Sequence, residues 1–136
     1  MSGKCSLLTV PINLDCEKTG MAFKFENLRV FRSAATLSNR IDRLVDKFPK
    51  KELFSLGSQI KRSADSVVLN IAEGCTGQTT GDFRRFLGIA LRSAIEVVAC
   101  LYLAFTRNYF SEQEYKSLYE EYEVLVKMIT RLRSRI

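Results

Sequence analysis

Apolar residues recur at alternating steps of four and three along most of the chain, and this spacing constrains the fold more than any other feature. It keeps the apolar residues on one side of an α-helix, as in helices that pack together in a bundle. The first such run extends from Asn27 to Phe48. Its expected core residues are Val30, Ala34, Leu37, Ile41, Leu44 and Phe48. Pro49 then ends the helix, because the residue before a proline avoids the helical conformation.

Three further runs share this spacing. The second begins near Lys51 and ends at Gly74, a residue suited to the left-handed turn that follows many helices. The third, capped by Thr79 or Thr80, should end near Asn108. The fourth begins at the capping box of Ser111 and Glu114. The expected core residues of the three are Leu53, Leu56, Ile60, Ala64, Val67 and Ile71; Phe83, Leu87, Ala90, Ala94, Val97, Leu101 and Phe105; and Tyr115, Leu118, Tyr122, Leu125, Ile129, Leu132 and Ile136.

Four amphipathic helices with short connections predict an all-α fold, an up-down-up-down antiparallel four-helix bundle. The 136 residues suffice for one domain. We assign residues 23–136 to the bundle and residues 1–22 to a flexible N-terminal extension. The apolar run in this extension, SLLTVPI, is short and contains a proline, which is not typical of a signal peptide. Met21 is an alternative start of the chain.

The chain is basic, with 21 Lys and Arg against 15 Asp and Glu and a net charge of +6. This surplus favours an anionic partner, nucleic acid before membrane, although many basic proteins bind neither. In the last helix the charges are divided. Residues 109–123 contain five Glu and one Lys, whereas residues 124–136 contain four cations and no acid. The helix dipole favours the same division, so both explanations stand at this point.

The absence of histidine excludes most hydrolytic triads and histidine metal ligands. The four cysteines, Cys5, Cys16, Cys75 and Cys100, show no CxxC spacing and are expected to be free, reduced thiols. We therefore expect a cytoplasmic protein that is not an enzyme and binds no metal and no cofactor.

Polar side chains flank the apolar stripes of the second and third helices. On helical geometry, Gln59, Ser63, Ser66, Asn70 and Glu73 share one flank of the second helix, with Arg62 at its edge, and Asp82, Ser93 and Glu96 share a flank of the third, with Arg85 nearby. In one interpretation these side chains are solvated or hydrogen-bonded between the helices. In the other, the small serines admit a close helix or subunit while Arg62, Glu73 and Glu96 form ion pairs. Both assign a structural or assembly role to Gln59, Ser66, Asn70, Glu73, Gly74, Ser93 and Glu96.

Two strings of the sequence carry a family resemblance. FPKKELFSLGSQIKRSADSVVLNIAEG, Phe48–Gly74, and FRRFLGIALRSAIE, Phe83–Glu96, resemble the four-helix-bundle proteins encoded by intervening sequences in bacterial 23S ribosomal RNA genes, also labelled S23. The resemblance extends from about Phe25 to the C-terminus. Two positions depart from the family pattern: Arg92 replaces a usual glycine, and Phe31 stands where tryptophan is common.

The resemblance implies a homopentamer of four-helix bundles around a central channel, without enzymatic activity. It also implies a relation to the accessory variability determinants of diversity-generating retroelements, which work beside a reverse transcriptase and bind nucleic acid through basic surfaces. We expect a homo-oligomer that binds RNA or an RNA–DNA hybrid and no membrane, with a reverse transcriptase as a candidate partner. A protein-interaction scaffold of unassigned role is the alternative.

The expected nucleic-acid contacts are cations near helix starts, on outward arcs and at the end of the last helix. They are Lys50, Lys51, Lys61, Arg62, Arg84, Arg85, Arg92, Lys127, Arg131, Arg133 and Arg135. The aromatic residues Phe83, Phe86, Phe105, Tyr115 and Tyr122 are assigned to the core, and no aromatic RNA-binding motif is present. Binding should therefore be mostly electrostatic.

Overall fold

The computed structural model describes residues 23–76 and 79–136. This part of the chain contains four α-helices and two short 3₁₀ helices, and no strand. The α-helices are α3 (Arg29–Val45), α4 (Leu56–Cys75), α5 (Thr80–Thr106) and α6 (Glu112–Arg135), and the 3₁₀ helices are η1 (Lys24–Asn27) and η2 (Lys50–Glu52). The predicted N-terminal extension, residues 1–22, lies outside the described residues.

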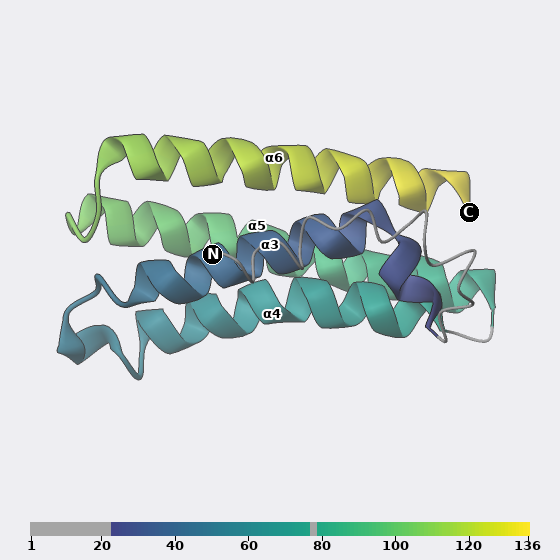
Figure 1. Ribbon diagram of the computed structural model, residues 1–136, viewed down its shortest axis with the longest axis horizontal. Helices are drawn as coiled ribbons and strands as arrows, with labels where there is room; N and C mark the ends of the chain where they lie inside the picture. Colours follow the sequence, from purple (N-terminus) through teal and green to yellow (C-terminus); the bar gives the residue numbers. More distant parts are fainter. Residues whose placement is uncertain (1–22, 77–78) are drawn as a thin grey trace.

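Consecutive helices run in opposite directions along the long axis of the molecule (Figure 1). Each helix packs against the next in the chain, and α3 also packs against α6, which closes the bundle. The packing of α4 on α5 is the most extensive, and that of α3 on α6 is the least. The predicted all-α four-helix bundle is confirmed.

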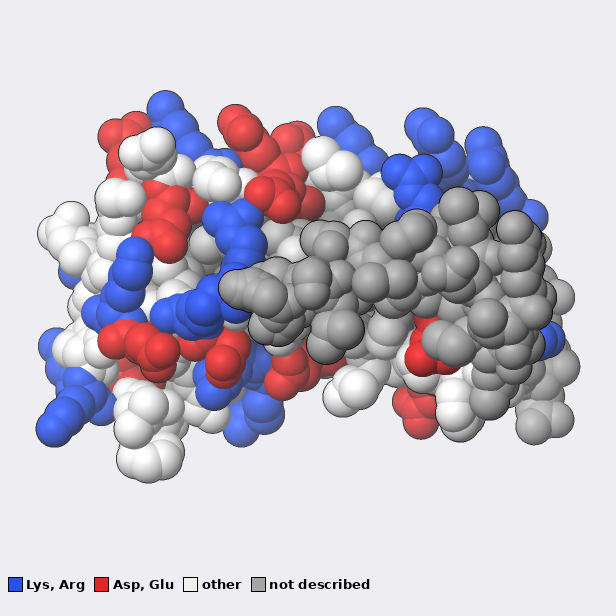
Figure 2. Space-filling view, viewed as in Figure 1, with Lys and Arg blue, Asp and Glu red and all other residues white. Residues whose placement is uncertain are grey.

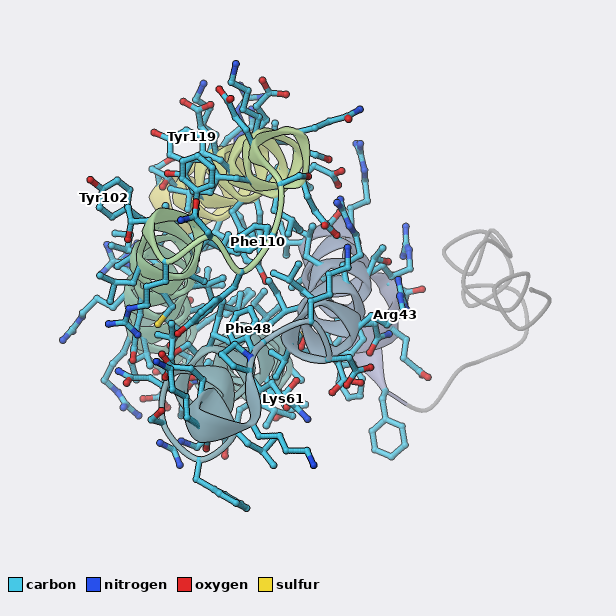
Figure 3. All side chains as sticks on the ribbon, turned by 90° about the vertical axis from the view of Figure 1, so that its left-hand side faces the viewer. Arg43, Phe48, Lys61, Tyr102, Phe110 and Tyr119 are labelled. Atoms are coloured by element: carbon cyan, nitrogen blue, oxygen red, sulfur yellow. The ribbon has the colours of Figure 1, made fainter. Side chains whose placement is uncertain are left out.

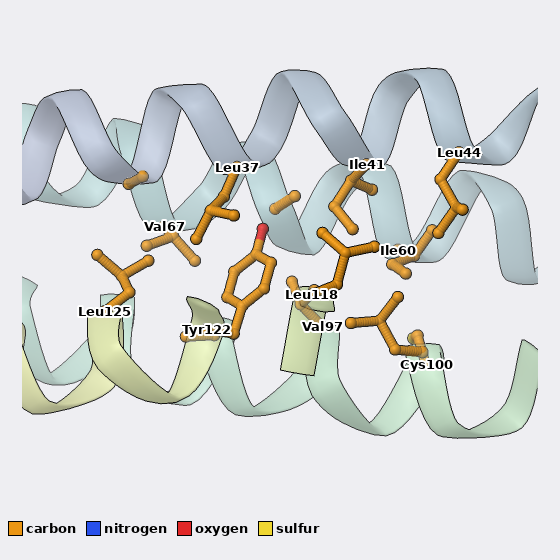
Figure 4. Close-up of a cluster of buried hydrophobic side chains, with 14 of the residues drawn as sticks. Leu37, Ile41, Leu44, Ile60, Val67, Val97, Cys100, Leu118, Tyr122 and Leu125 are labelled. Atoms are coloured by element: carbon orange, nitrogen blue, oxygen red, sulfur yellow. The ribbon is translucent and has the colours of Figure 1, made fainter. Parts of the chain in front are cut away.

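The predicted apolar stripes form the core. All six stripe residues of the first run are buried, and the buried members of the other stripes are Leu56, Ile60, Ala64, Val67, Ile71, Leu87, Ala90, Ala94, Val97, Leu101, Leu118, Tyr122, Leu125 and Ile129. Burying one large aliphatic side chain contributes about 1.5–3 kcal/mol to stability. In the middle of the core the ring of Tyr122 lies among Leu37, Val67 and Leu125, with its hydroxyl directed toward α3 (Figure 4).

The prediction for the start of the second helix is wrong. Residues 50–52 form η2, the helix begins at Leu56, and Leu53 is half exposed instead of buried in the core. Glu52 provides the physical reason. Its carboxylate is buried and accepts hydrogen bonds from Ser55, Arg107 and Tyr109. These bonds hold the connection as a turn before α4 begins.

The prediction for Gly74 is also wrong, because this residue lies inside α4 and not in a left-handed turn after it. Its hydrogen atom allows α4 to approach α5 closely. A Cβ atom at Gly74 would lie 2.7 Å from the Cβ of Phe86 and 3.1 Å from the Cδ1 of Phe83. Any larger residue would push the two helices apart at this point.

The predicted caps at Thr79 and Ser111 are present, but the capping box is half formed, because the described residues show no hydrogen bond from the Ser111 amide to the Glu114 carboxylate. The Thr79 hydroxyl accepts a hydrogen bond from the amide three residues on (3.0 Å), and the Ser111 hydroxyl does the same for Glu114 (3.1 Å). The Glu114 carboxylate bonds Lys47 at 2.7 Å, so its side chain ties α6 to the end of the first helix. α5 ends two residues before the predicted Asn108, which has a positive φ of 63°.

Candidate nucleic-acid interface

The polar side chains that flank the apolar stripes of the second and third helices, which we call the polar ribbon, join α4 to α5 within one chain. The hydroxyls of Ser66 and Ser93 are hydrogen-bonded at 2.8 Å. The Asn70 amide donates to the Ser66 carbonyl (2.8 Å) and hydroxyl (3.0 Å), and the Gln59 amide donates to Glu96 (2.9 Å). A polar group at a helix seam is tolerated when it finds such partners. The bonds of Ser66 to Ser93 and of Gln59 to Glu96 confirm the interpretation as hydrogen bonds between the two helices, whereas both bonds of Asn70 stay within α4.

The alternative ion pairs are not formed among the described residues. Arg62 and Glu73 are exposed and share no salt bridge, and Glu96 accepts from Gln59 instead. Ser63 is buried beside the seam. The carboxylates of the ribbon therefore bind no cation of the described chain, and Glu96 acts as a hydrogen-bond acceptor.

The predicted basic residues separate into two groups, one near the start of α4 and the other along the first half of α5 and the second half of α6. The first group belongs to η2 and the start of α4 and contains Lys50, Lys51, Lys61 and Arg62, all exposed. Lys61 forms a 2.8 Å salt bridge with Asp42 of α3, and this hydrogen bond and charge raise the pKa of the lysine. This end of the molecule is thus partly neutralised.

The second group lies along the first half of α5 and the second half of α6. We call it the α5/α6 basic surface, and it consists of Arg84, Arg85, Arg92, Lys127, Arg131, Arg133 and Arg135. None of these seven residues forms a salt bridge with a described residue. Figure 2 shows cations over the C-terminal half of α6 and acids over its N-terminal half. The antiparallel packing of the two helices brings together cations that lie far apart in the sequence.

Arg133 also has a structural role within this surface. Its Nε donates to the carbonyl oxygen of Arg84 at 2.8 Å, and its guanidinium covers Gly88, where an added Cβ would lie 3.3 Å away. Arg85 lies over the ring of Phe86, with 4.5 Å between the guanidinium carbon and the ring centroid. The remaining cations of the surface are exposed and extend from α5 and α6 without such contacts.

Two further features escape the sequence reasoning. One is the cluster around Glu52, where hydrogen bonds from Ser55 and Tyr109 lower the pKa of the carboxyl to about 2. In the sequence Glu52 is followed by Leu53 and Phe54, and this local pattern does not indicate that the Glu52 carboxylate is buried. Its partners, Arg107 and Tyr109, lie more than fifty positions away, so no local signal identifies the cluster.

The other is an apolar groove on the outer side of α5 and α6. It has a volume of about 700 Å³ and is lined by Ile95, Val98, Ala99, Tyr102, Leu103, Tyr115, Tyr119, Tyr122, Glu123, Val126 and Lys127. Tyr102 and Tyr119 stand on the outside of the bundle, whereas Phe48 and Phe110 point inward (Figure 3). The sequence contains one signal for this groove: Ile95 and Tyr102 are large apolar residues that lie off the apolar stripe of α5.

The described residues contain no group of three acidic or cysteine side chains placed to hold a metal ion. Cys75 and Cys100 are free thiols, and burial raises the pKa of both. Cys5 and Cys16 lie outside the described residues. α5 is long and apolar enough to cross a membrane by length and composition, a property that a core helix of a bundle shares.

The comparisons with known proteins agree with this architecture. No curated protein matches the chain. A solved structure from Bacteroides thetaiotaomicron, described as a protein with unknown function from the S23 ribosomal protein family, is 26% identical with a TM-score of 0.72. The match covers 77% of this chain and 95% of that one. The family model "23S rRNA-intervening sequence protein" matches residues 26–131, and the chain therefore belongs to the 23S rRNA-intervening sequence protein family.

Proposed function

We propose that this protein is a non-enzymatic, cytoplasmic, oligomeric bundle that binds RNA or an RNA–DNA hybrid through the α5/α6 basic surface. One observation carries the proposal: seven cations lie along the first half of α5 and the second half of α6 and form no salt bridge with the described residues. Elsewhere Arg40, Lys47 and Arg107 are paired with glutamates, whereas Lys50, Lys51 and Arg62 near the start of α4 are exposed and form no salt bridge with a described residue. Closely spaced, unneutralised cations attract a polyanion.

The chemistry of the surface favours phosphate contacts over base recognition. Arginine and lysine bind phosphate oxygens without reading sequence, and binding of this kind weakens steeply with salt. An oligomer would repeat the surface and turn weak contacts into useful avidity. The resemblance of the sequence supports a pentamer and work beside a reverse transcriptase of a diversity-generating retroelement, and we include both in the proposal.

A filter-binding titration with structured RNA, an RNA–DNA hybrid and duplex DNA tests the proposal. The variant Arg92→Gln/Arg131→Gln/Arg135→Gln removes three exposed cations of the surface. Arg43→Gln/Lys61→Gln/Arg62→Gln removes the same formal charge near the end of α3 and the start of α4 and is the matched control. We expect the first variant to bind at least tenfold more weakly at low salt and to reduce the slope of log K against log salt by about 2. The control should retain most of the affinity.

Two results would contradict the proposal. One is the absence of measurable affinity at about 50 mM salt, where phosphate binding is strong. The other is an equal loss in both triple variants, which would mean that net charge matters and the α5/α6 basic surface does not. Circular dichroism of each variant establishes that the bundle is retained.

The apolar groove favours a second candidate function, a protein-interaction scaffold. Exposed apolar patches of this kind mark sites where proteins bind. Co-purification distinguishes the two functions. Complexes that nuclease dissolves support nucleic-acid binding, and complexes that survive nuclease and contain a second protein, such as a reverse transcriptase, support the scaffold.

A further inference from the structure

The apolar groove exposes more large apolar surface than a solvated helix face needs. Ile95 is 60% exposed, Tyr102 is 56% exposed, and Leu103 and Tyr119 are 41% and 43% exposed. The four side chains border one hollow between α5 and α6. A contiguous apolar hollow of this kind on a protein surface indicates an interaction site. A second molecule is therefore expected to cover the groove.

The opposite shape occurs at another place in the same chain. In the connection between α3 and α4, Phe54 is 90% exposed and its neighbour Leu53 is 50% exposed. They form a projecting apolar knob, which we define as Leu53 and Phe54. A single exposed apolar residue is ordinary, but an almost fully exposed phenylalanine beside a leucine is a feature of binding surfaces.

The knob is held in place and not merely left on a loose loop. Glu52, directly before it, is 8% exposed and accepts hydrogen bonds from Ser55 (2.7 Å), Tyr109 (2.7 Å) and Arg107 (2.8 Å). Ser55 directly follows the knob, and Arg107 and Tyr109 lie just after the end of α5. Both sides of the knob are therefore anchored to the bundle. A pre-organised anchor loses less conformational entropy on binding than a mobile one.

The charges around the two features are complementary. Lys50 and Lys51 precede the knob and are exposed. Glu123 and Lys127 line the groove, and Glu120 lies one turn before Glu123 on the exposed side of α6, so the acids outnumber the cation there. None of these five residues forms a salt bridge with a described residue. A knob docked in the groove would bring the lysines toward the glutamates at the rim, where charge pairs set orientation and register.

We propose that the knob of one copy inserts into the groove of a second copy. The inference rests on the oligomeric part of the proposed function and names the surfaces that produce it. Knob and groove are exposed in the same chain, so they do not cover each other within one molecule. The contact joins two different patches, which makes it heterologous, and repetition closes a ring or extends a filament according to the rotation between copies. The apolar knob supplies the buried centre and the charges supply the rim.

Light scattering on three single variants tests the proposal. Phe54→Ser removes the knob, and Tyr102→Lys places a cation in the groove opposite Lys50 and Lys51. Leu69→Ser is the matched control, because Leu69 is 64% exposed but lies on the α3/α4 side of the molecule. All three positions are exposed, so the fold should be retained. We expect the first two variants to have the mass of a single chain and the control to keep the mass of the unmodified assembly.

Mixing the two defective variants gives a sharper result. The groove of Phe54→Ser and the knob of Tyr102→Lys are both intact, so an equimolar mixture can form one contact but cannot propagate it. We expect the mixture to have twice the mass of a single chain, whereas each variant alone does not associate. A symmetric interface would not be restored in this way, because each partner would bring a defect to the same patch.

The proposal is overturned if the unmodified protein has the mass of a single chain, if Phe54→Ser keeps the full assembly, or if the mixture fails to associate. The substitutions Phe54→Ser, Tyr102→Lys and Leu69→Ser leave all seven residues of the α5/α6 basic surface unchanged, so assembly and nucleic-acid binding are measured separately. A protein that assembles through the knob but ignores RNA would refute the proposed function alone. A protein that binds RNA as a single chain would refute the assembly inference alone.

Discussion

Tyr122 carries a buried hydroxyl whose oxygen has no hydrogen-bond partner among the described residues. The side chain is 1% exposed, and its ring packs in the middle of the core (Figure 4). Burying a hydroxyl without a partner costs about 1–3 kcal/mol. Tyr122→Phe removes the hydroxyl and keeps the ring. We expect the variant to be more stable by about 1 kcal/mol, the lower part of that range, because loss of the oxygen leaves a small void.

Urea unfolding followed by circular dichroism measures this effect. The midpoint should increase with an unchanged m-value, since the surface exposed on unfolding is the same. In a chain of this size the melting temperature should rise by about 3–5 °C. Tyr119→Phe is the control. Tyr119 is 43% exposed, so removing its hydroxyl should change the free energy of unfolding by less than about 0.5 kcal/mol.

Alkaline pH provides an independent test of the same reasoning. Burial raises the pKa of Tyr122 above its usual value of 10. Below pH 10 the hydroxyl is protonated in both states and contributes no pH dependence. Above pH 10 the unfolded chain releases the proton and the folded chain keeps it, so stability falls as the pH rises. Tyr122→Phe should lose less stability in this range. A variant that is less stable than the unmodified protein by 1 kcal/mol or more, or that shows the same alkaline loss, would refute the argument.

Two further substitutions test the corrections to the sequence reasoning. Gly74→Ala should lower the free energy of unfolding by about 1–3 kcal/mol, because its Cβ would lie 2.7 Å from that of Phe86. Gly81→Ala is the control and should be tolerated, because the nearest atom to its Cβ would be 3.7 Å away. If the two variants had equal urea midpoints, α4 and α5 would not be in tight contact at Gly74. Glu52→Gln should weaken the acid dependence of stability. Since hydrogen bonds from Ser55 and Tyr109 lower the pKa of Glu52 from 4.5 to about 2, the unmodified protein loses stability as the pH falls through this interval, and an identical acid profile in the variant would contradict the assignment.

The sequence predicted the fold and most of the core because burial in a bundle has a local signature. A residue every three or four positions stays on one side of a helix whatever it packs against. Val30, Ile60, Leu87 and Leu118 are buried as their spacing predicts. The caps at Thr79 and Ser111 follow equally local rules, since their partners lie three residues away.

The errors arose where distant residues decide the local structure. Leu53 continues the apolar spacing, yet it is exposed because Glu52 is bound by Arg107 and Tyr109 from the end of α5. Gly74 has the composition of a helix terminator, yet its neighbours Phe83 and Phe86 belong to the next helix and require close approach. Spacing along one segment contains no information about either contact.

The same division applies to the candidate interface. The sequence alone established a surplus of six positive charges and identified the lysines and arginines that carry it. The tertiary structure decided that Lys61 is neutralised by Asp42 while Arg84 and Arg133 are brought together at one end of the bundle. The physical reason is that helix periodicity is a property of neighbours in the chain, whereas ion pairing, grooves and charge clusters depend on which helices lie side by side.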